Sequence, residues 1–235
     1  MLDILVGSRA TIRPTIFIDL EGVSLGREGE LCLLAIHHTI SKRSFVVDVH
    51  RLGASAFSTP ASDGTTTLKT VLESPTIAKG IFDVRNDSAA LYHGFGVRLQ
   101  CLHDIQLLEI VARPQIWASS RRFRCSLEKV IRRHSNMTLA ETADWSATKT
   151  LGVGLFAPER GGSYDVFKQR PLNPLLIPYS INDVICLPQL YDKFSSNLSP
   201  HVKRDVESKT EQAIVETMSP RYRGNGRDRT LSPWA

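Results

Sequence analysis

The sequence of 235 residues lacks several features that would place it in a specialised class of protein. It has only four cysteines, and no two of them form a Cys-x-x-Cys pair, which argues against a zinc ribbon and against a disulfide framework. We therefore expect reduced thiols that are mostly buried. The cysteines are Cys32, Cys101, Cys125 and Cys186.

Long apolar runs are also missing. No stretch approaches the roughly 18 consecutive apolar residues that a membrane-spanning helix needs. The opening residues, MLDILVGSRATIRP, carry Asp3 inside a short apolar run with no basic segment before it, so they do not resemble a secretory signal. We expect no membrane association and an intracellular protein of the cytoplasm or nucleus.

The charge balance is nearly even, since 29 basic and 24 acidic side chains leave a formal charge of +5. Such a mild excess suits a polyanionic partner, but it also fits many proteins that bind nothing charged. Hydrophobic residues make up 42% of the chain, which is ordinary for a folded core. The composition predicts a globular protein and does not identify its partner.

The first fifty residues contain three short apolar runs, rich in Ile, Val, Leu and Phe, that predict β-strands. Gly-containing or polar segments separate them, which is typical of an antiparallel meander. The runs are TIFIDL at 15–20, ELCLLAIHH at 30–38 and SFVVDV at 44–49.

Strands and helices alternate after this meander. The pattern predicts strands at 77–84 and near 101–104, helices at 68–74, 86–96, 105–113, 125–134 and 179–194, and irregular chain at 54–67 and 135–178. A meander followed by such units predicts an α/β fold with a mixed sheet, antiparallel and then parallel, flanked by helices. We expect one domain at 1–200, and a C-terminal helix with a basic, disordered tail at 201–235.

The segment TIFIDLEGV at 15–23 places two carboxylates in a strand that should be buried. Asp19 and Glu21 are two residues apart, so on a strand both side chains leave the same face. An isolated pair of this kind more often has one residue facing water at the strand end. The functional alternative gains weight only if other carboxylates join the pair.

Two further segments supply such carboxylates. In FDVRNDSAALY, Asp83 and Asp87 lie where a strand meets a helix, so either could project over the sheet edge or simply cap the helix. Asp87 is the better ligand candidate because it lies within the start of the helix. In YSIND, Tyr179 and Asp183 are four residues apart on one helix face, although alone they would be explained better as a core tyrosine above a solvated aspartate.

Four carboxylates gathered in one cleft repel one another unless divalent cations neutralise them. Hard oxygen ligands select Mg²⁺ or Mn²⁺, and two such ions about 4 Å apart can clamp the attacking and leaving oxygens of a phosphodiester displacement. The order of these segments therefore predicts a two-metal site.

These residues resemble the three motifs of the DEDDy-type 3′-5′ exonucleases, in the ribonuclease D and Egalitarian-like branch of the ribonuclease H-like superfamily. The motifs correspond to IDLEG, FDVRNDSAAL and YSINDV, and the resemblance runs from Thr15 to Phe194. The linking segments LHDIQLLE, SLEKVIRRH and FKQRPLNPLLIPYSINDV are also similar to the family. This chain departs from it at Phe167, usually Trp, at Ile105, usually Thr, and in the segment 135–164, which has no clear equivalent.

The resemblance implies a ribonuclease H-like mixed sheet and a set of site residues. Asp19, Glu21, Asp87 and Asp183 would hold two Mg²⁺ or Mn²⁺ ions, and Tyr179 would orient the attacking water. A phenol with a pKa near 10 is a poor base at neutral pH, so orientation is the better role for Tyr179. The implied reaction releases nucleoside 5′-monophosphates from the 3′ end of single-stranded nucleic acid, with RNA favoured over DNA.

One stretch could supply positive charge for such a substrate. Residues 113–133 hold seven Lys or Arg and one acidic residue, with Trp117 and Phe123 among them, which suits a phosphate backbone with stacked bases. Solvated arginines beside core aromatics would explain the stretch equally well. Two other functions stay open at this point: a catalytically weak or silent RNA- or protein-binding adaptor, and a DNA-directed repair exonuclease.

Overall fold

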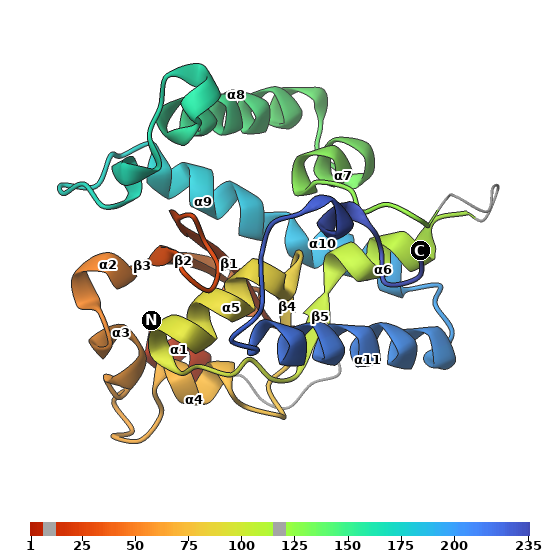
Figure 1. Ribbon diagram of the computed structural model, residues 1–235, viewed down its shortest axis with the longest axis horizontal. Coiled ribbons are helices and arrows are strands. Elements are labelled where there is room, and N and C mark those ends of the chain that lie inside the picture. Colours follow the sequence, from red (N-terminus) through yellow and green to blue (C-terminus); the bar gives the residue numbers. More distant parts are fainter. Residues whose placement is uncertain (7–12, 115–120) are drawn as a thin grey trace.

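A computed structural model describes residues 1–6, 13–114 and 121–235, and its centre is a five-stranded mixed sheet of order β3-β2-β1-β4-β5 (Figure 1). The first three strands form the expected antiparallel meander, and the last two continue the sheet in parallel beside β1. The predicted mixed α/β sheet is therefore confirmed. The strands are β1 (Ile16–Val23), β2 (Glu30–His38), β3 (Arg43–Asp48), β4 (Lys79–Ile81) and β5 (Leu102–Asp104).

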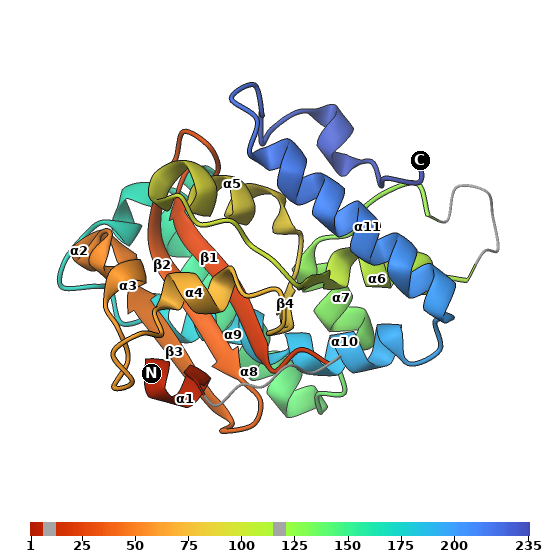
Figure 2. The ribbon, with the colours of Figure 1, turned by 90° about the horizontal axis from the view of Figure 1, so that it is seen from below.

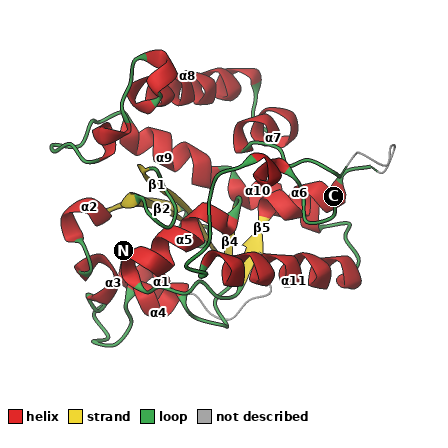
Figure 3. Cartoon of the chain, in the orientation of Figure 1, coloured by secondary structure: helices red, strands yellow, loops and turns green. Residues whose placement is uncertain are grey.

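Helices cover both faces of this sheet, as Figure 3 shows, and each face has its own hydrophobic core. The first core involves α1 (Leu2–Val6), α2 (Val49–Leu52), α3 (Ser55–Ser58), α4 (Leu68–Leu72), α5 (Val84–Phe95) and part of α11 (Pro200–Thr217). The second involves α6 (Ile105–Ala112), α7 (Leu127–His134), α8 (Leu139–Phe156), α9 (Leu176–Ile185), α10 (Leu187–Ser195) and the start of α11. Short 3₁₀ turns lie at Pro158–Arg160, Tyr164–Phe167 and Arg227–Thr230. No described helix combines the length and the apolar character that crossing a membrane requires.

Strand β1 divides its side chains between these two cores. Ile18 and Leu20 enter the first core, whereas Phe17 enters the second. Because side chains alternate along a strand, Asp19 and Glu21 continue the Phe17 face, where α9 lies across β1 and β2. Apolar residues on both faces thus anchor the start of β1 in the two cores. Further along the strand, the face that carries Phe17 presents the two carboxylates.

The pairing of β1 with β2 is irregular directly after Glu21. Glu21 pairs with Leu33 but Gly22 pairs with Leu31, so β2 carries one extra residue at this point. A Cβ atom on Gly22 would lie 2.0 Å from the carbonyl oxygen of Glu30, so only glycine fits there. Bulges of this kind bend a strand and often lie beside functional sites.

Helix α8 lies in a segment for which the sequence predicts no regular structure. Its start is fixed by a capping box, in which the Thr138 side chain accepts a hydrogen bond from the Glu141 amide and Glu141 reaches back to the Thr138 amide. Its middle is attached to α9 by Trp145, whose indole Nε1 donates to the Asn182 carbonyl at 3.3 Å. The prediction of irregular chain at 135–178 is therefore wrong for this part of the segment. The Gly and Pro content suggested irregular chain, but the capping box at Thr138 starts a regular helix.

The C-terminal segment after Pro220 also differs from the disordered tail that its composition predicts. It runs back beside α11 (Figure 2), with the Tyr222 side chain buried at 4% exposure. The Ser232 amide donates to the Arg122 carbonyl at 2.9 Å, and the Trp234 indole donates to Asp205 at 2.8 Å. Two aromatic anchors therefore offset the polar composition, while the domain boundary at residue 200 stays a prediction.

Candidate active site

Three of the predicted carboxylates meet at one point between the sheet and α9. One oxygen from each of Asp19, Glu21 and Asp183 lies within 4.8 Å of the others. The first two come from the same face of β1, and Asp183 comes from α9, which crosses that face. Asp183 is 4% exposed, whereas Asp19 and Glu21 are only partly buried.

Asp87 lies near this cluster but not within the same group of three. It is buried in the first turn of α5, and its pKa is raised well above the ordinary value by burial and by the charge of Asp19. The carboxylate of nearby Asp83 accepts two hydrogen bonds from the Arg85 guanidinium, one from Nε and one from Nη2, at 2.7 Å each. Among the described residues Asp87 has no cationic partner, which agrees with the preference for Asp87 over Asp83 as a ligand.

The position of Asp87 depends on Asp104, to which the sequence assigns no role. The carboxylate of Asp104 accepts hydrogen bonds from the amides of Asp83, at 3.0 Å, and Val84, at 3.2 Å. It also accepts one from the Gln106 amide at the start of α6, at 2.9 Å. One buried carboxylate thus fixes the starts of α5 and α6, and Asp83 is held there with a φ of 64°, a strained conformation for a residue other than glycine.

Tyr179 lies one helical turn before Asp183, and its side chain is 5% exposed. Its ring packs against α8, where it meets Phe156 edge-on at 5.4 Å between centroids. A Cβ atom on Gly152 would lie 2.2 Å from the Tyr179 ring. The glycine in the middle of α8 therefore leaves the space that the tyrosine occupies.

A cation from α8, Lys149, reaches the cluster, and no pattern in the sequence selects this residue. Its Nζ donates to the Tyr179 hydroxyl at 3.0 Å, forms an ion pair with Asp183, and lies 4.2 Å from the centroid of the tyrosine ring. Burial lowers the pKa of Lys149, but the negative charges of Asp183, Glu21 and Asp19 together raise it by more. The pKa therefore lies above its ordinary value, and the ammonium stays charged. A lysine in a segment without a family counterpart offers no motif by which it could be found.

The carboxylates carry more negative charge than one ammonium can neutralise. Burial and then the charge of Asp183 raise the pKa of Asp19 to about 7. Burial and then the charges of Asp19 and Asp183 raise the pKa of Glu21 well above its usual range. The Oδ1 atom of Asp183 is buried without a hydrogen-bond partner, and every donor in the cluster is oxygen, so the residues fit a hard divalent cation.

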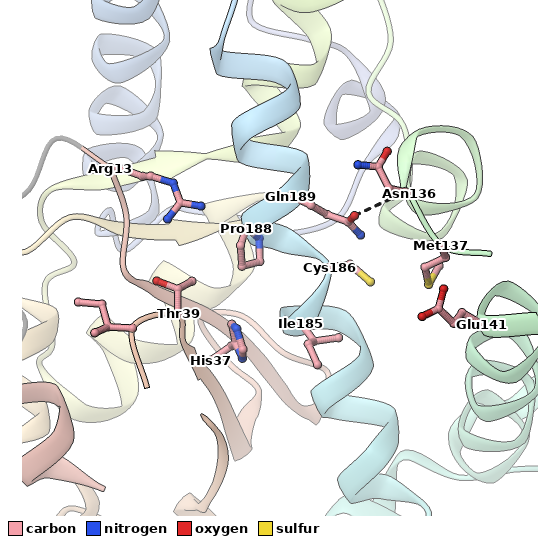
Figure 4. A pocket seen from close by; sticks show the side chains of 11 residues that line it. Arg13, His37, Thr39, Asn136, Met137, Glu141, Ile185, Cys186, Pro188 and Gln189 are labelled. Carbon is pink, nitrogen blue, oxygen red and sulfur yellow. Dashed lines mark hydrogen bonds between the residues drawn. The ribbon is translucent and has the colours of Figure 1, made fainter. Parts of the chain in front are cut away.

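One cavity lies away from these carboxylates. It has a volume of about 720 Å³ and is lined by Arg13, His37, Glu141 and other residues, but by none of the candidate site residues (Figure 4). A smaller cavity of about 200 Å³ reaches the start of α5, where Asp87 and Gly224 of the C-terminal segment help to line it. The chemistry of the carboxylates, and not the size of the cavity, therefore identifies the candidate site.

In the described part of the basic stretch at 113–133, three arginines are half-buried and four basic side chains are exposed: Arg113, Arg121 and Arg124, and then Arg122, Lys129, Arg132 and Arg133. Arg113 pairs with Glu109, and Arg124 donates to the Gln106 side chain at 2.7 Å. Trp117 lies outside the described residues, while the Phe123 side chain is 50% exposed. The stretch thus combines structural arginines with one exposed aromatic ring, so both interpretations of its sequence apply in part.

Several solved nucleases have structures similar to this one. RNase D of Trypanosoma brucei in complex with RNA U12 aligns with a TM-score of 0.69 and 20% identity over 96% of this chain and 69% of that chain. The same enzyme with GMP aligns with a TM-score of 0.71 and 22% identity, over 96% of this chain and 63% of that chain. NrnC of Brucella melitensis with bound Mg²⁺ aligns with a TM-score of 0.60 and 14% identity, over 92% of this chain and 93% of that chain. At such identities the likeness confirms the ribonuclease H-like fold.

Sequence comparison gives the assignment that structural likeness alone does not. No curated protein matches the chain in a direct search. The family model described as 3′-5′ exonuclease, however, matches residues 7–199, which include all the candidate site residues. The chain belongs to the 3′-5′ exonuclease family.

Proposed function

We propose that this protein is a divalent-metal-dependent exonuclease that removes nucleotides from the 3′ end of single-stranded RNA. The observation that carries the proposal is the meeting of Asp19, Glu21 and Asp183 beside Tyr179, in a chain of the 3′-5′ exonuclease family. Phosphodiester hydrolysis needs cations where negative charge develops, and crowded carboxylates with raised pKa values are suited to hold them.

Asp19, Glu21, Asp87 and Asp183 would hold two ions, Mg²⁺ or Mn²⁺. Asp19 would contribute to the charge at both ends of this set, because its negative charge raises the pKa of Glu21 and of Asp87 more than any other neighbouring charge does. Ions bound there would lower the pKa of a water molecule and stabilise the departing 3′ oxygen. Asp104 would support this arrangement by fixing the start of the helix that carries Asp87.

Tyr179 would orient the attacking water through its hydroxyl. Burial, and then the charges of Glu21 and Asp183, raise the pKa of Tyr179 far above its ordinary value. The phenol therefore stays protonated at neutral pH, and it can position a water molecule but cannot remove its proton. This agrees with the role inferred from the sequence.

The choice of RNA and of mononucleotide products rests on the similar structures. RNase D was solved with RNA and with GMP, which supports an RNA substrate and release of nucleoside 5′-monophosphates. A DNA-directed repair exonuclease would use the same carboxylates, and an adaptor would keep the fold without cleavage. The substrate experiment must therefore separate all three functions.

The test is incubation of purified protein with RNA and DNA oligonucleotides of the same sequence, labelled at the 5′ end, with Mg²⁺, Mn²⁺ or EDTA. We expect a descending ladder on RNA that requires metal, nucleoside 5′-monophosphates by mass spectrometry, and survival of circular RNA. An Asp19→Asn variant purified in parallel controls for contaminating nuclease. A ladder on DNA alone, cutting of the circle, or tight binding without cleavage would each contradict the proposal.

A further inference from the structure

An ammonium group stands among the carboxylates that the proposed function assigns to metal ions. Lys149 bonds Oδ2 of Asp183, while Oδ1 of the same carboxylate has no partner. It also donates to the Tyr179 hydroxyl at 3.0 Å, so both of its partners are candidate site residues of α9. The Lys149 side chain is 15% exposed, and its charge is thus shielded from most solvent.

A purely structural role in attaching α8 to α9 does not account for this arrangement. Trp145 already joins the helices through the Asn182 carbonyl, and Phe156 packs on the Tyr179 ring. Burying an ammonium costs free energy unless negative charge compensates it. Lys149 is compensated by the cluster itself, because Asp19 and Glu21 act on it in addition to Asp183.

We infer that Lys149 is a built-in cation that occupies the Asp183 side of the carboxylate cluster and competes with divalent metal there. The inference rests on the proposed function, because it takes the cluster to be a metal site. In the metal-free protein, Lys149 offsets part of the repulsion among the carboxylates. A metal ion that takes Oδ2 of Asp183 as a ligand must displace the ammonium, whereas an ion that takes Oδ1 alone can bind beside it.

A count of charges indicates how the site fills. The four carboxylates, when ionised, carry four negative charges, and Lys149 with one divalent ion supplies three positive charges. A second divalent ion raises the positive total to five, so it enters an environment that is already nearly neutral. The first ion therefore binds tightly with Lys149 in place, and the second binds weakly until the ammonium leaves Asp183. The flexible stem of a lysine then lets the released ammonium turn toward the phosphate of a substrate.

Mn²⁺ binding tests this directly, with electron paramagnetic resonance to count free ions over metal-stripped protein. In the parent protein we expect one tight ion and a second that binds at least about tenfold more weakly. In Lys149→Met the second ion should bind about 10- to 100-fold more tightly, within the range by which groups that contact ligands alter metal affinity. Lys168→Met is the matched control, since Lys168 pairs with Glu30 and Asp165, outside the cluster.

Two further variants keep the test decisive if the methionine variant folds poorly in the absence of metal. Lys149→Gln removes the charge but keeps a hydrogen-bond donor, so it should also increase the affinity for the second Mn²⁺ ion. Lys149→Arg keeps the charge, so the second ion should bind as weakly as in the parent protein. Equal affinities in the parent, Met and Gln variants would overturn the inference. Mn²⁺ binding that persists unchanged in Asp19→Asn would instead contradict the proposed function, so the two failures are distinguishable.

Discussion

Two buried lysines in this protein have opposite electrostatic surroundings. Lys79, at the start of β4, is fully buried, and its Nζ donates to the carbonyl oxygens of Val71 at 3.1 Å and Ser74 at 2.9 Å. Burial lowers its pKa to about 8. Lys149 is less deeply buried, with its side chain 15% exposed, and its pKa lies above the ordinary value because Asp183 and its neighbours outweigh the effect of burial.

The partners of a buried lysine indicate whether its role is structural or functional. The carbonyl partners of Lys79 lie at and just beyond the end of α4, so this lysine stabilises the C-terminal end of that helix. Lys149 faces carboxylates that exceed it in charge and leave one oxygen unpaired. A buried lysine beside carbonyls is a structural residue, whereas one beside an excess of carboxylates marks a site for further cations.

The largest expected effect comes from removing one carboxylate of the cluster. Asp19→Asn should lower single-turnover cleavage of RNA by more than about 10³-fold, since loss of a metal ligand exceeds the loss of one electrostatic donor. The metal-free variant should be as stable as the parent or more stable, because a crowded carboxylate with a pKa of about 7 is gone. Urea denaturation in EDTA checks the stability. Cleavage at the parent rate would remove Asp19 from the site.

Loss of the compensating ammonium should have the next largest effect. Lys149→Met should lower the free energy of unfolding of the metal-free protein by roughly 3 kcal/mol, because it leaves buried carboxylates without their cation. Mn²⁺ should restore most of this loss, since divalent ions replace the missing charge. Urea denaturation with EDTA and with Mn²⁺ measures both effects, with Lys168→Met as the control. If the variant is as stable as the parent in EDTA, the cluster does not depend on Lys149.

The Tyr179 hydroxyl contacts Lys149 and, in the proposed mechanism, the attacking water. Tyr179→Phe removes that hydroxyl and should lower the single-turnover rate by about 10²-fold, at the lower end of what positioned groups contribute. Asp183→Ala should cost more, and Mn²⁺ should rescue it in part, whereas no ion can replace a hydroxyl. Rates across a Mn²⁺ titration compare the two variants. A Phe variant as fast as the parent would make Tyr179 a packing residue.

The other lysine predicts a dependence of stability on pH. The pKa of Lys79 is about 8 when folded and near the ordinary 10.5 when unfolded, so between these values the unfolded chain binds more protons. Raising the pH from 8 to 10.5 should therefore stabilise the protein through this residue by roughly 2 to 3 kcal/mol. Lys79→Met should lack this part of the slope. Urea denaturation of both proteins over that pH range isolates it from other titrating groups.

The fold and most of the carboxylate site could be predicted from the sequence, because both rest on local patterns. Alternation in β1 places Asp19 and Glu21 on one face, and helical spacing places Tyr179 and Asp183 on another. Their meeting required only that α9 cross β1. The role of Asp104 was missed, since its hydrogen bonds to the start of α5 depend on how β4 and β5 pair.

Lys149 could not be found because its contacts come from the packing of α8 on α9 and from no motif. The capping box at Thr138 predicts the start of a helix, but it does not say which face of that helix meets Tyr179. Gly152 was likewise hidden, since a glycine within a helix usually counts against the helix. The need for glycine at position 152 follows only from the packing of the Tyr179 ring against it, which the sequence does not show.

The smallest expected effect tests this last contact with a pair of glycines from the same helix. Replacing a helical glycine by alanine usually stabilises a protein by up to about 1 kcal/mol, and Gly154→Ala should do so because nothing lies within 4 Å of its Cβ position. Gly152→Ala should instead destabilise by about 1 kcal/mol and slow cleavage several-fold, since overpacking moves the Tyr179 ring and, with it, the hydroxyl that Lys149 contacts. Thermal denaturation and single-turnover rates of the two variants measure the difference. If both alanines stabilise equally and neither alters the rate, the packing of α8 on Tyr179 does not set the geometry of the site, and Lys149 must be held there by the carboxylates alone.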